Sequence, residues 1–333
     1  YLDYIKALHP RMPDEDHKSF ENSRSAKRFD DLRDLLPFAT RTNVALSGNG
    51  RAFESLVNKL LSHPLGEIRY WGQALTRELD EVAPAFVARP QTERGAQTQT
   101  YLRNINALRK EIAGVVLEGV AEQNEPVRWA KLINSTTDAD IEILSAFLLP
   151  AAKGQTLEQI RAEVSRMSSQ ERSRYLKRIL DERDLGDPDA GRDQVRFREV
   201  PRAFENADYL YEVFSRGGDY RDLHRHRQQT QERHPFTNKF GYDLESEVLN
   251  SPFATVIKDA IDRANEVVNA LSQTFSQEVA QYAVPFADIQ HWYMNMSAKE
   301  IYLIVELRTG PQGSPHYREI CQQIARQAID ASP

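Results

Sequence analysis

The chain has 333 residues, of which 40% are hydrophobic and 28% charged, and its formal net charge at pH 7 is −6. This length is enough for two domains with a sizeable core, and the composition is that of an ordinary soluble globular protein. The net acidity argues against general binding to nucleic acid or to a membrane surface, and no apolar run approaches the roughly 18 residues of a membrane-spanning helix.

Cysteine usage and the first residues bear on the compartment. The single cysteine, Cys321, excludes an internal disulfide and fits a reducing environment. The first residues lack the basic, apolar and small-residue order of a secretory signal. We therefore expect a cytoplasmic location, and the absence of an initial Met suggests a start part-way into a longer protein.

In chain order, the first predicted elements are helices separated by prolines. After a polar segment over residues 1–31, a short helix over Ala26–Leu36 is expected to end at Pro37. Residues Phe38–Leu46 alternate enough for a strand or an extended entry. The segments that follow are an amphipathic helix over Arg51–Leu61, a helix over Gly66–Val82 and a linker or loop over residues 83–100.

Beyond this linker the pattern mixes helices with short strands. The predicted elements are a helix over Tyr101–Glu122, a strand over Val127–Leu132, a helix over Thr137–Ala152, a helical region over Leu157–Arg183 divided near Met167, a turn-rich loop over Asp184–Gln194, a strand over Tyr209–Phe214, and helices over Phe253–Ala280 and Glu319–Ala328. We expect an α+β protein with long helices packed on short β-sheets.

A locally basic stretch lies inside this acidic chain, between Phe204 and Tyr242. It combines three histidines with five arginines, namely His224, His226, His234, Arg216, Arg221, Arg225, Arg227 and Arg233. Guanidinium groups are planar and always charged, which suits phosphates and the edges of flavin or pyrimidine rings. The alternative that composition alone favours is a solvated basic helix face.

The last part of the chain echoes the first. The triplet Pro37-Phe38-Ala39 recurs as Pro285-Phe286-Ala287, 248 residues later (285 − 37). Each triplet leads through a short extended segment into an amphipathic helix, a proline-containing turn and a Glu-Ile pair, at Glu67-Ile68 and at Glu319-Ile320. The shared order of elements favours a tandem duplication.

The basic stretch resembles the flavin-dependent thymidylate synthase (ThyX) family. The likeness rests on Phe204-Glu205, then the strand over Tyr209–Phe214, then Arg221 and the triplet Arg225-His226-Arg227. Both repeats add residues that are similar to the family pattern. These are Leu32–Pro37 and Asn49-Gly50-Arg51 in the first repeat, and Val279–Pro285, Ser297-Ala298-Lys299 and Arg308 in the second.

The resemblance implies a ThyX-like fold with a tandem duplicated unit. Residues 1–90 would form the C-terminal half of a first unit that is incomplete in this chain. Residues 91–124 would form a linker and connecting helix, and residues 125–333 a complete second unit. We expect a homodimer that mimics the family tetramer, in which sites lie at subunit interfaces.

The family methylates dUMP to dTMP with FAD as hydride carrier, NADPH as reductant and methylenetetrahydrofolate as carbon donor. The resemblance implies the same chemistry here. Arginines suit it because two anions must be held side by side, and positive charge beside the uracil would stabilise a nucleophilic C5. Since the flavin supplies hydride, no cysteine nucleophile is needed, and Cys321 is expected to be a packed small hydrophobe.

The resemblance also assigns roles by position. Arg308 takes the position of the catalytic arginine. The implied flavin-contacting residues are Arg225, His226, Arg227, Asn49, Arg51, Ser297 and Lys299. The implied substrate-contacting residues are Arg33, Arg221, Asp222 and Arg308. Arg33, Asn49 and Arg51 survive in the first repeat where Gln281, Ser297 and Lys299 stand in the second, so sites shared between the repeats are expected.

Several positions depart from the family pattern. They are Thr230, Pro235 and Thr237 in place of two serines and an arginine, Ser55 and Leu303 in place of a flavin-contacting Asn, Leu60 in place of Arg308 in the first repeat, and Asp222 in place of a Gln. An acidic group beside a nucleotide phosphate is unfavourable. Two alternatives therefore stay open, a degenerate non-catalytic flavin- or nucleotide-binding protein or scaffold, and a flavin reaction on another pyrimidine.

Metal and RNA sites are the remaining alternatives. His224 and His226, at i and i+2, point to different faces of a helix, and no ligand set completes them. RNA binding by the basic stretch would need interleaved aromatic residues, and Tyr220 alone lies inside it. Neither a Walker-type loop nor Gly-x-Gly-x-x-Gly occurs, so FAD would be held by side chains.

Overall fold

The computed structural model describes residues 1–122, 128–185, 195, 198–310 and 313–332. The chain divides into two compact units. Unit 1 comprises Tyr1–Phe38, Asn124–Val268 and Ala283–Pro333, and unit 2 comprises Ala39–Gln123 and Asn269–Tyr282. Each unit is described below by itself.

Unit 1 is built on a four-stranded antiparallel sheet in the order β1-β2-β4-β3. The strands are β1 (Trp129–Ser135), β2 (Asp208–Arg216), β3 (Gln229–Arg233) and β4 (Ile289–Ser297). The two central strands pair along their whole length, from Asp208 opposite Ser297 to Arg216 opposite Ile289. Large side chains alternate along both, and the period of two turns them toward one buried face.

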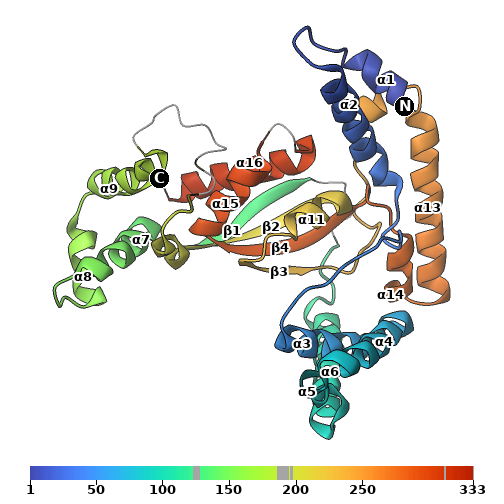
Figure 1. Cartoon of the computed structure of the whole chain (residues 1–333), viewed down its shortest axis with the longest axis horizontal. Helices are drawn as coiled ribbons and strands as arrows, with labels where there is room; N and C mark the ends of the chain where they lie inside the picture. Colours follow the sequence, from blue (N-terminus) through green and yellow to red (C-terminus); the bar gives the residue numbers. More distant parts are fainter. Residues whose placement is uncertain (123–127, 186–194, 196–197, 311–312, 333) are drawn as a thin grey trace. The chain divides into compact units, whose positions relative to one another are not determined.

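Helices α15 (Ala298–Arg308) and α16 (Pro315–Ala331) lie over that face of the sheet (Figure 1). The core between the two layers contains Tyr209, Tyr211, Val213, Trp292, Met294, Met296, Ile301, Ile304, Ile320, Cys321 and Ile324. On the opposite face Tyr293 is 39% exposed, so the sheet is covered on one side there and open on the other. This is an α+β fold, as predicted.

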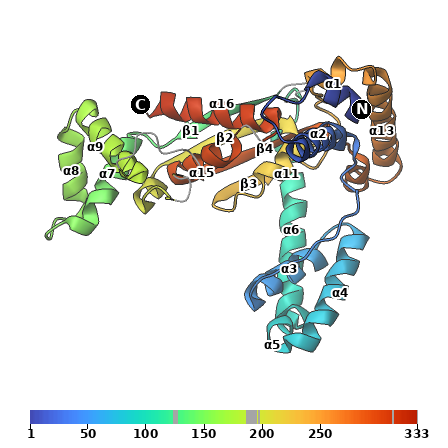
Figure 2. The same ribbon diagram turned by 45° about the horizontal axis from the view of Figure 1, so that its top comes forward.

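The other helices of unit 1 group at the two ends of the sheet (Figures 1 and 2). At one end lie α7 (Ala139–Leu148), η3 (Leu149–Ala151), α8 (Leu157–Arg166), α9 (Ser169–Asp181) and η4 (Glu182–Asp184), followed in the chain by η5 (Arg202–Asn206). At the other end lie α1 (Leu2–Leu8), α2 (His17–Leu32), η1 (Arg33–Leu35), α12 (Ser246–Leu249) and α13 (Ala254–Thr274), whose last residues belong to unit 2.

Unit 2 is helical in its described residues. It contains α3 (Gly50–Leu61), α4 (Gly66–Val82), α5 (Pro84–Val87), η2 (Arg89–Gln91), α6 (Glu93–Val116) and α14 (Gln277–Ala280), and η6 (Gln281–Ala283) ends it. Figure 2 shows α3, α4 and α5 gathered around the long α6. Gly72 allows α4 to approach α3, because a Cβ there would lie 2.9 Å from Leu60 Cβ.

Helix capping explains where several elements begin. The predicted division near Met167 is confirmed, since capping boxes at Thr156–Gln159 and Ser168–Glu171 start α8 and α9 separately. The predicted helix over Gly66–Val82 is α4 with the same bounds. The helix expected over Ala26–Leu36 is wrong at its start, because the Asp16 side chain caps α2 at His17.

Other predictions need correction. Residues 83–100 are not a linker, because α5, η2 and the start of α6 occupy them, and the Thr92 side chain caps α6 there. The helix expected over Phe253–Ala280 is interrupted before Ser276, which caps α14. Phe38–Leu46 forms no strand. Most of the loop expected over Asp184–Gln194 lies outside the described residues, as does Val127 of the first strand.

The two Pro-Phe-Ala triplets meet each other. Pro37 and Pro285 form an antiparallel bridge, and the Phe38 and Phe286 rings pack edge to face at 4.8 Å. The Phe38 N–H donates to the Val284 carbonyl (3.0 Å), and the Phe286 N–H donates to the Leu36 carbonyl (2.9 Å). Leu36 and Val284 are 248 residues apart, and so are Phe38 and Phe286. Replacing each residue by its counterpart in the other triplet therefore turns one hydrogen bond into the other, as a two-fold axis would.

Elements recur at nearly the same offset. The pairs are η1 with η6, α3 with α15, and α4 with α16. Two features break the correspondence. Residues 41–49 form no strand although 289–297 form β4. The two Glu-Ile pairs stand one turn apart, at the second and third residues of α4 and at the fifth and sixth of α16.

Asp288, just after the second triplet, makes unit 1 sensitive to pH. The residue is fully buried, its Oδ1 accepts from Asn265 Nδ2 (3.2 Å), and its Oδ2 has no partner in the described part of the chain. Burial, reinforced by the charge of Asp262, raises the pKa of Asp288 to about 8. Protonation of Asp288 therefore makes its full contribution to the free energy of unfolding below about pH 4. This contribution is lost as pH rises through about 8.

We expect Asp288→Asn to raise the free energy of unfolding at about pH 8 by at least about 1 kcal/mol relative to the unsubstituted chain. The amide keeps the shape of the side chain and removes the charge that burial disfavours. Urea unfolding at about pH 5.5 and about pH 8 checks this, with the exposed Asp208→Asn as control. An unchanged pH dependence in Asp288→Asn would contradict it.

Candidate functional site

The basic stretch forms a short helix and a turn between two strands of the sheet. Strand β2 runs directly into α11 (Gly217–Leu223), and Arg225-His226-Arg227 follows α11 before β3 begins. A side chain at Gly217 would collide with the Phe38 ring, since a Cβ would lie 2.6 Å from its Cζ. The strand predicted ahead of the triplet is confirmed, and the short helix α11 separates the two.

The three residues of the triplet point in different directions. Arg225 and Arg227 are exposed, whereas His226 is 8% exposed. His224 ends α11 and hydrogen-bonds Gln231 through Nδ1 (2.6 Å). Among the described residues, no group of three or more His, Cys, Asp or Glu side chains is placed to hold a metal ion. The triplet therefore presents two guanidinium groups to solvent and one imidazole to the interior.

The buried imidazole of His226 joins the triplet to the predicted catalytic arginine. Arg308 Nε donates to His226 Nε2 (3.0 Å), and His226 Nδ1 lies 3.0 Å from Glu300 Oε1. Both Glu300 and Arg308 belong to α15. Residues 82 positions apart in the chain, His226 and Arg308, are thus in direct contact.

Arg308 keeps most of its binding capacity. Its guanidinium lies 5.8 Å from the centre of the Tyr317 ring, and it forms no ion pair in the described part of the chain. With Nε bonded to His226, Nη1 and Nη2 have no hydrogen-bond partner among the described residues. Four N–H groups of a half-buried cation are therefore available to an anion or a carbonyl.

Asp222 lies between two arginines. Arg33 Nη2 is 3.1 Å from its Oδ2, and Arg225 Nη2 is 3.6 Å from its Oδ1. Arg33 comes from η1 and Asp222 from α11, 189 residues later in the chain. The structure brings these three predicted residues together. An acidic residue beside a nucleotide phosphate is unfavourable, but here the two arginines compensate the negative charge of Asp222.

Arg221 makes a different contact. Its guanidinium lies over the Phe286 ring, 4.7 Å from the ring centre. Cation–π contacts of this kind hold a guanidinium in place while leaving its edge open to other partners. Arg221 thus lies on the same helix as Asp222 but is fixed by the second Pro-Phe-Ala triplet.

A buried network of charges lies behind this surface. Arg216 is 3% exposed, and its Nη1 is 2.5 Å from Asp34 Oδ2 while its Nε is 3.4 Å from Asp219 Oδ2. Glu245 lies 3.8 Å from Arg216 Nη2 and 3.0 Å from His316 Nε2. Burial lowers the pKa of His316, but hydrogen bonds to Asp243 and Glu245 outweigh it, and the net shift is upward.

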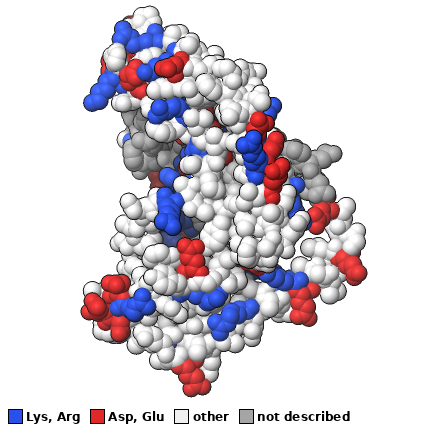
Figure 3. All heavy atoms as spheres, turned by 90° about the vertical axis from the view of Figure 1, so that its right-hand side faces the viewer, with Lys and Arg blue, Asp and Glu red and all other residues white. Residues whose placement is uncertain are grey.

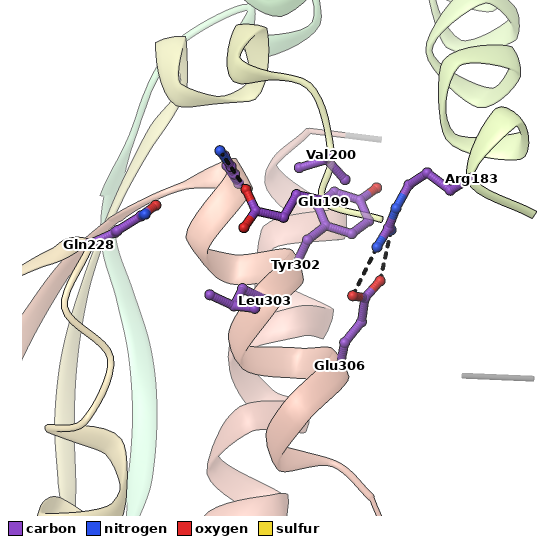
Figure 4. A pocket seen from close by; sticks show the side chains of 8 residues that line it. Arg183, Glu199, Val200, Gln228, Tyr302, Leu303 and Glu306 are labelled. Atoms are coloured by element: carbon purple, nitrogen blue, oxygen red, sulfur yellow. Dashed lines mark hydrogen bonds and ion pairs between the residues drawn. The ribbon is translucent and has the colours of Figure 1, made fainter. Parts of the chain in front are cut away.

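A small pocket borders α15 (Figure 4). Its lining consists of Arg183, Glu199, Val200, Gln228, Lys299, Tyr302, Leu303 and Glu306. Two ion-pair systems border it: Arg183 pairs with both carboxylate oxygens of Glu306 (2.7 and 2.9 Å), and Lys299 with Glu199 (3.0 Å) and Glu205 (3.2 Å). The predicted cofactor residue Lys299 thus has carboxylate partners already.

The remaining predicted residues begin helices. Ser297 caps α15, its side chain accepting from the Glu300 N–H (3.3 Å), and Asn49 caps α3, its side chain accepting from the Ala52 N–H (2.9 Å). Arg51 is exposed on α3. Asn49 and Arg51 belong to unit 2 and are described within it alone.

Sequence reasoning missed two features of the site. It did not single out Glu300, although Glu300 precedes Arg308 by eight residues, a spacing that puts both on one side of a helix. It also counted Arg216 with the basic surface, whereas Arg216 is buried. For Cys321 the prediction is confirmed, because the residue is fully buried and burial raises the pKa of its thiol to about 12.

Surface charge and helix hydropathy complete the description. On the face drawn in Figure 3, Lys and Arg side chains are interspersed with Asp and Glu side chains. Neither sign forms a continuous field on that face. No helix in the described part of the chain combines the length and the apolar character needed to cross a bilayer.

The family profile described as thymidylate synthase complementing protein (Thy1) matches residues 131–333. This chain belongs to that family, which is the ThyX family that the sequence resembles. The matched region contains α11, the Arg225-His226-Arg227 triplet and all of α15. The family as a whole is thymidylate synthase-related and in general uses a flavin.

Three relatives align with nearly the whole chain. It is 30% identical over 333 residues to a UPF0159 protein of Chlamydia pneumoniae and 29% over 332 residues to one of Chlamydia muridarum, covering 99% of this chain in both cases. It is 28% identical over 317 residues, 95% of the chain, to a UPF0159 protein of Thermoplasma acidophilum. The chain spans about 60% of the length of each relative.

Proposed function

We propose that this protein methylates dUMP to dTMP in an FAD-dependent thymidylate synthase reaction with methylenetetrahydrofolate and NADPH. The observation that carries the proposal is Arg308, held at Nε by the buried His226 with its other N–H groups available. A fixed cation of this kind stabilises negative charge on a pyrimidine as C5 becomes nucleophilic. Arg225 and Arg227, on either side of His226 in the sequence, carry exposed guanidinium groups.

The residues present fit an anionic dinucleotide cofactor. Besides the groups on Arg308, Arg33 has a buried Nε without a hydrogen-bond partner in the described part of the chain. When bound, FAD supplies the hydride chemistry. The chain's own part is to bind the cofactor through Arg225 and Arg227 and the dUMP phosphate through Arg33, and to place the Arg308 charge beside the pyrimidine.

The Arg33–Asp222 contact supports a site shared between the repeats. We propose that residues 1–90 are the C-terminal half of a first ThyX-like unit and residues 125–333 a complete second one, with 91–124 connecting them. The reciprocal hydrogen bonds at Phe38 and Phe286 support this duplication. One chain would then mimic a dimer, and a homodimer would mimic the family tetramer.

A non-catalytic flavin- or nucleotide-binding role is the second candidate. It is favoured by the pocket along α15, where Lys299 already pairs with Glu199 and Glu205 and where Leu303 offers no hydrogen bond. A purified protein that is colourless and does not respond to added FAD would support a scaffold. A yellow protein without turnover would support binding alone.

Arginine substitutions test the catalytic proposal. We expect Arg308→Ala to lower kcat/KM by about 100-fold, the usual effect of removing one donor that stabilises developing charge. We expect Arg33→Ala to weaken dUMP binding by about 10-fold, since a charge-assisted bond is worth about 1.5 kcal/mol or more. Fluorescence titration with FAD and dUMP and a turnover assay measure both.

The exposed Arg174 on α9 provides the control, and Arg174→Ala should leave both quantities unchanged. Binding that is unaffected in both Arg33→Ala and Arg308→Ala would reject the shared site. Turnover in Arg308→Ala equal to that of the unsubstituted chain would reject the catalytic role of Arg308.

A further inference from the structure

Glu300 is a buried carboxylate to which none of the roles above is assigned. It is 1% exposed and stands in the first turn of α15, where the helix dipole favours a negative charge. Its backbone N–H donates to Ser297 Oγ, but its side chain does not return to cap the helix. Instead, Oε1 lies 3.0 Å from Nδ1 of His226, which lies between α11 and β3.

The position of the His226 proton follows from Arg308. A guanidinium only donates hydrogen bonds, so the contact from Arg308 Nε to His226 Nε2 requires a lone pair on Nε2. The imidazole is then neutral, with its proton on Nδ1, and it donates to Glu300 Oε1. Glu300, His226 and Arg308 thus form a directed chain of two hydrogen bonds.

The second oxygen of Glu300 shows that this arrangement has a cost. Oε2 is buried and has no hydrogen-bond partner in the described part of the chain. A buried carboxylate with one satisfied oxygen is destabilising unless another interaction offsets it. Beyond the hydrogen bond at Oε1 lie the His226 imidazole and then the cationic Arg308.

We propose that Glu300 is a positioning residue which fixes the His226 tautomer and thereby orients the Arg308 guanidinium toward the substrate; this inference rests on the proposed function. Without the acceptor at Nδ1, the imidazole can carry its proton on Nε2. That proton would face the Arg308 N–H, and two donors cannot bond. Arg308 would then lose the contact that holds its plane.

The test compares two substitutions of Glu300. Glu300→Gln keeps an acceptor oxygen for His226 Nδ1, whereas Glu300→Leu fills a similar volume and keeps none. Nitrogen-15 NMR of ring-labelled histidine reports the His226 tautomer, assigned with His226→Asn, and needs neither FAD nor dUMP. Exchange of the Arg308 Nε–H with solvent, assigned with Arg308→Lys, reports whether the guanidinium is held.

We expect the Nδ1–H tautomer in the unsubstituted chain and in Glu300→Gln, and loss of that tautomer with faster Arg308 Nε–H exchange in Glu300→Leu. In the same variant dUMP affinity should fall about 10-fold, and in Glu300→Gln it should change less than about 3-fold. Glu306→Leu, on the same helix but paired with Arg183, should leave the tautomer unchanged.

The outcomes separate this inference from the proposed function. A tautomer that is the same in Glu300→Leu and the unsubstituted chain overturns the positioning role, whatever the activity. If Glu300→Leu does not fold, an Nε2–H tautomer in the unsubstituted chain or in Glu300→Gln overturns it instead. A tautomer that switches in a protein without affinity for FAD or dUMP supports the positioning role and counts against the proposed function.

Discussion

Replacing Arg216 by alanine is expected to lower the free energy of unfolding by about 3–5 kcal/mol, the usual cost of breaking a buried ion pair from one side. Arg216 is 3% exposed and is the shared cation of Asp34 and Asp219, which are themselves buried. Truncation removes the cation that the two carboxylates share, in a region where both are buried. Urea unfolding at neutral pH measures the loss.

The control is an arginine that is paired at the surface. Arg161 Nη2 lies 2.7 Å from Glu142 Oε1, but its side chain is 52% exposed. Arg161→Ala should therefore cost no more than about 1 kcal/mol. If the two substitutions have equal effects, the buried network does not stabilise unit 1 in the way its geometry suggests.

Trp292→Ala is expected to cost about 3–5 kcal/mol, the range for removing a large aromatic side chain from a core. Trp292 is 1% exposed on β4 and packs edge to face with Tyr220 of α11, with ring centres 5.3 Å apart. Its loss opens a cavity beneath the helix that leads into the triplet. Thermal and urea unfolding should both report the destabilisation.

The next residue on the same strand is the matched control. Tyr293 faces the opposite side of the sheet and is 39% exposed, so Tyr293→Ala should cost about 1 kcal/mol or less. Comparable losses for the two substitutions would mean that the open face is buried in solution, for example by another copy of the chain.

Local signals predicted much of the fold. The strand predicted over Tyr209–Phe214, the amphipathic helix over Arg51–Leu61 and the helix over Gly66–Val82 come within two residues of the bounds of β2, α3 and α4. Where the predictions failed, capping residues set the helix starts instead. Thr92 caps α6 inside a stretch that its two prolines had marked as a linker. For residues 41–49 the pattern allows a strand, but a strand needs a partner, and sequence periodicity does not reveal whether one is present.

The site was predictable in part. The spacing that resembles the family located the Arg225-His226-Arg227 triplet and Arg308, and the structure joins them through His226. Spacing in the sequence could not predict that Arg33 compensates the negative charge of Asp222, because 189 residues separate the two in the chain. Nor could it assign Glu300, since a lone Glu in the first turn of a helix is usually a capping residue.

The reciprocal pair Phe38 and Phe286 has a consequence for how this protein can change. At the two-fold axis of a homodimer the same codon encodes both sides of the contact, so one mutation changes both sides. Here two codons supply them, and the sides already differ: Phe38 stacks on Phe236 at 3.6 Å, whereas Phe286 lies under the Arg221 guanidinium. Each side of the contact can therefore change toward its own neighbour without the same substitution being imposed on the other side.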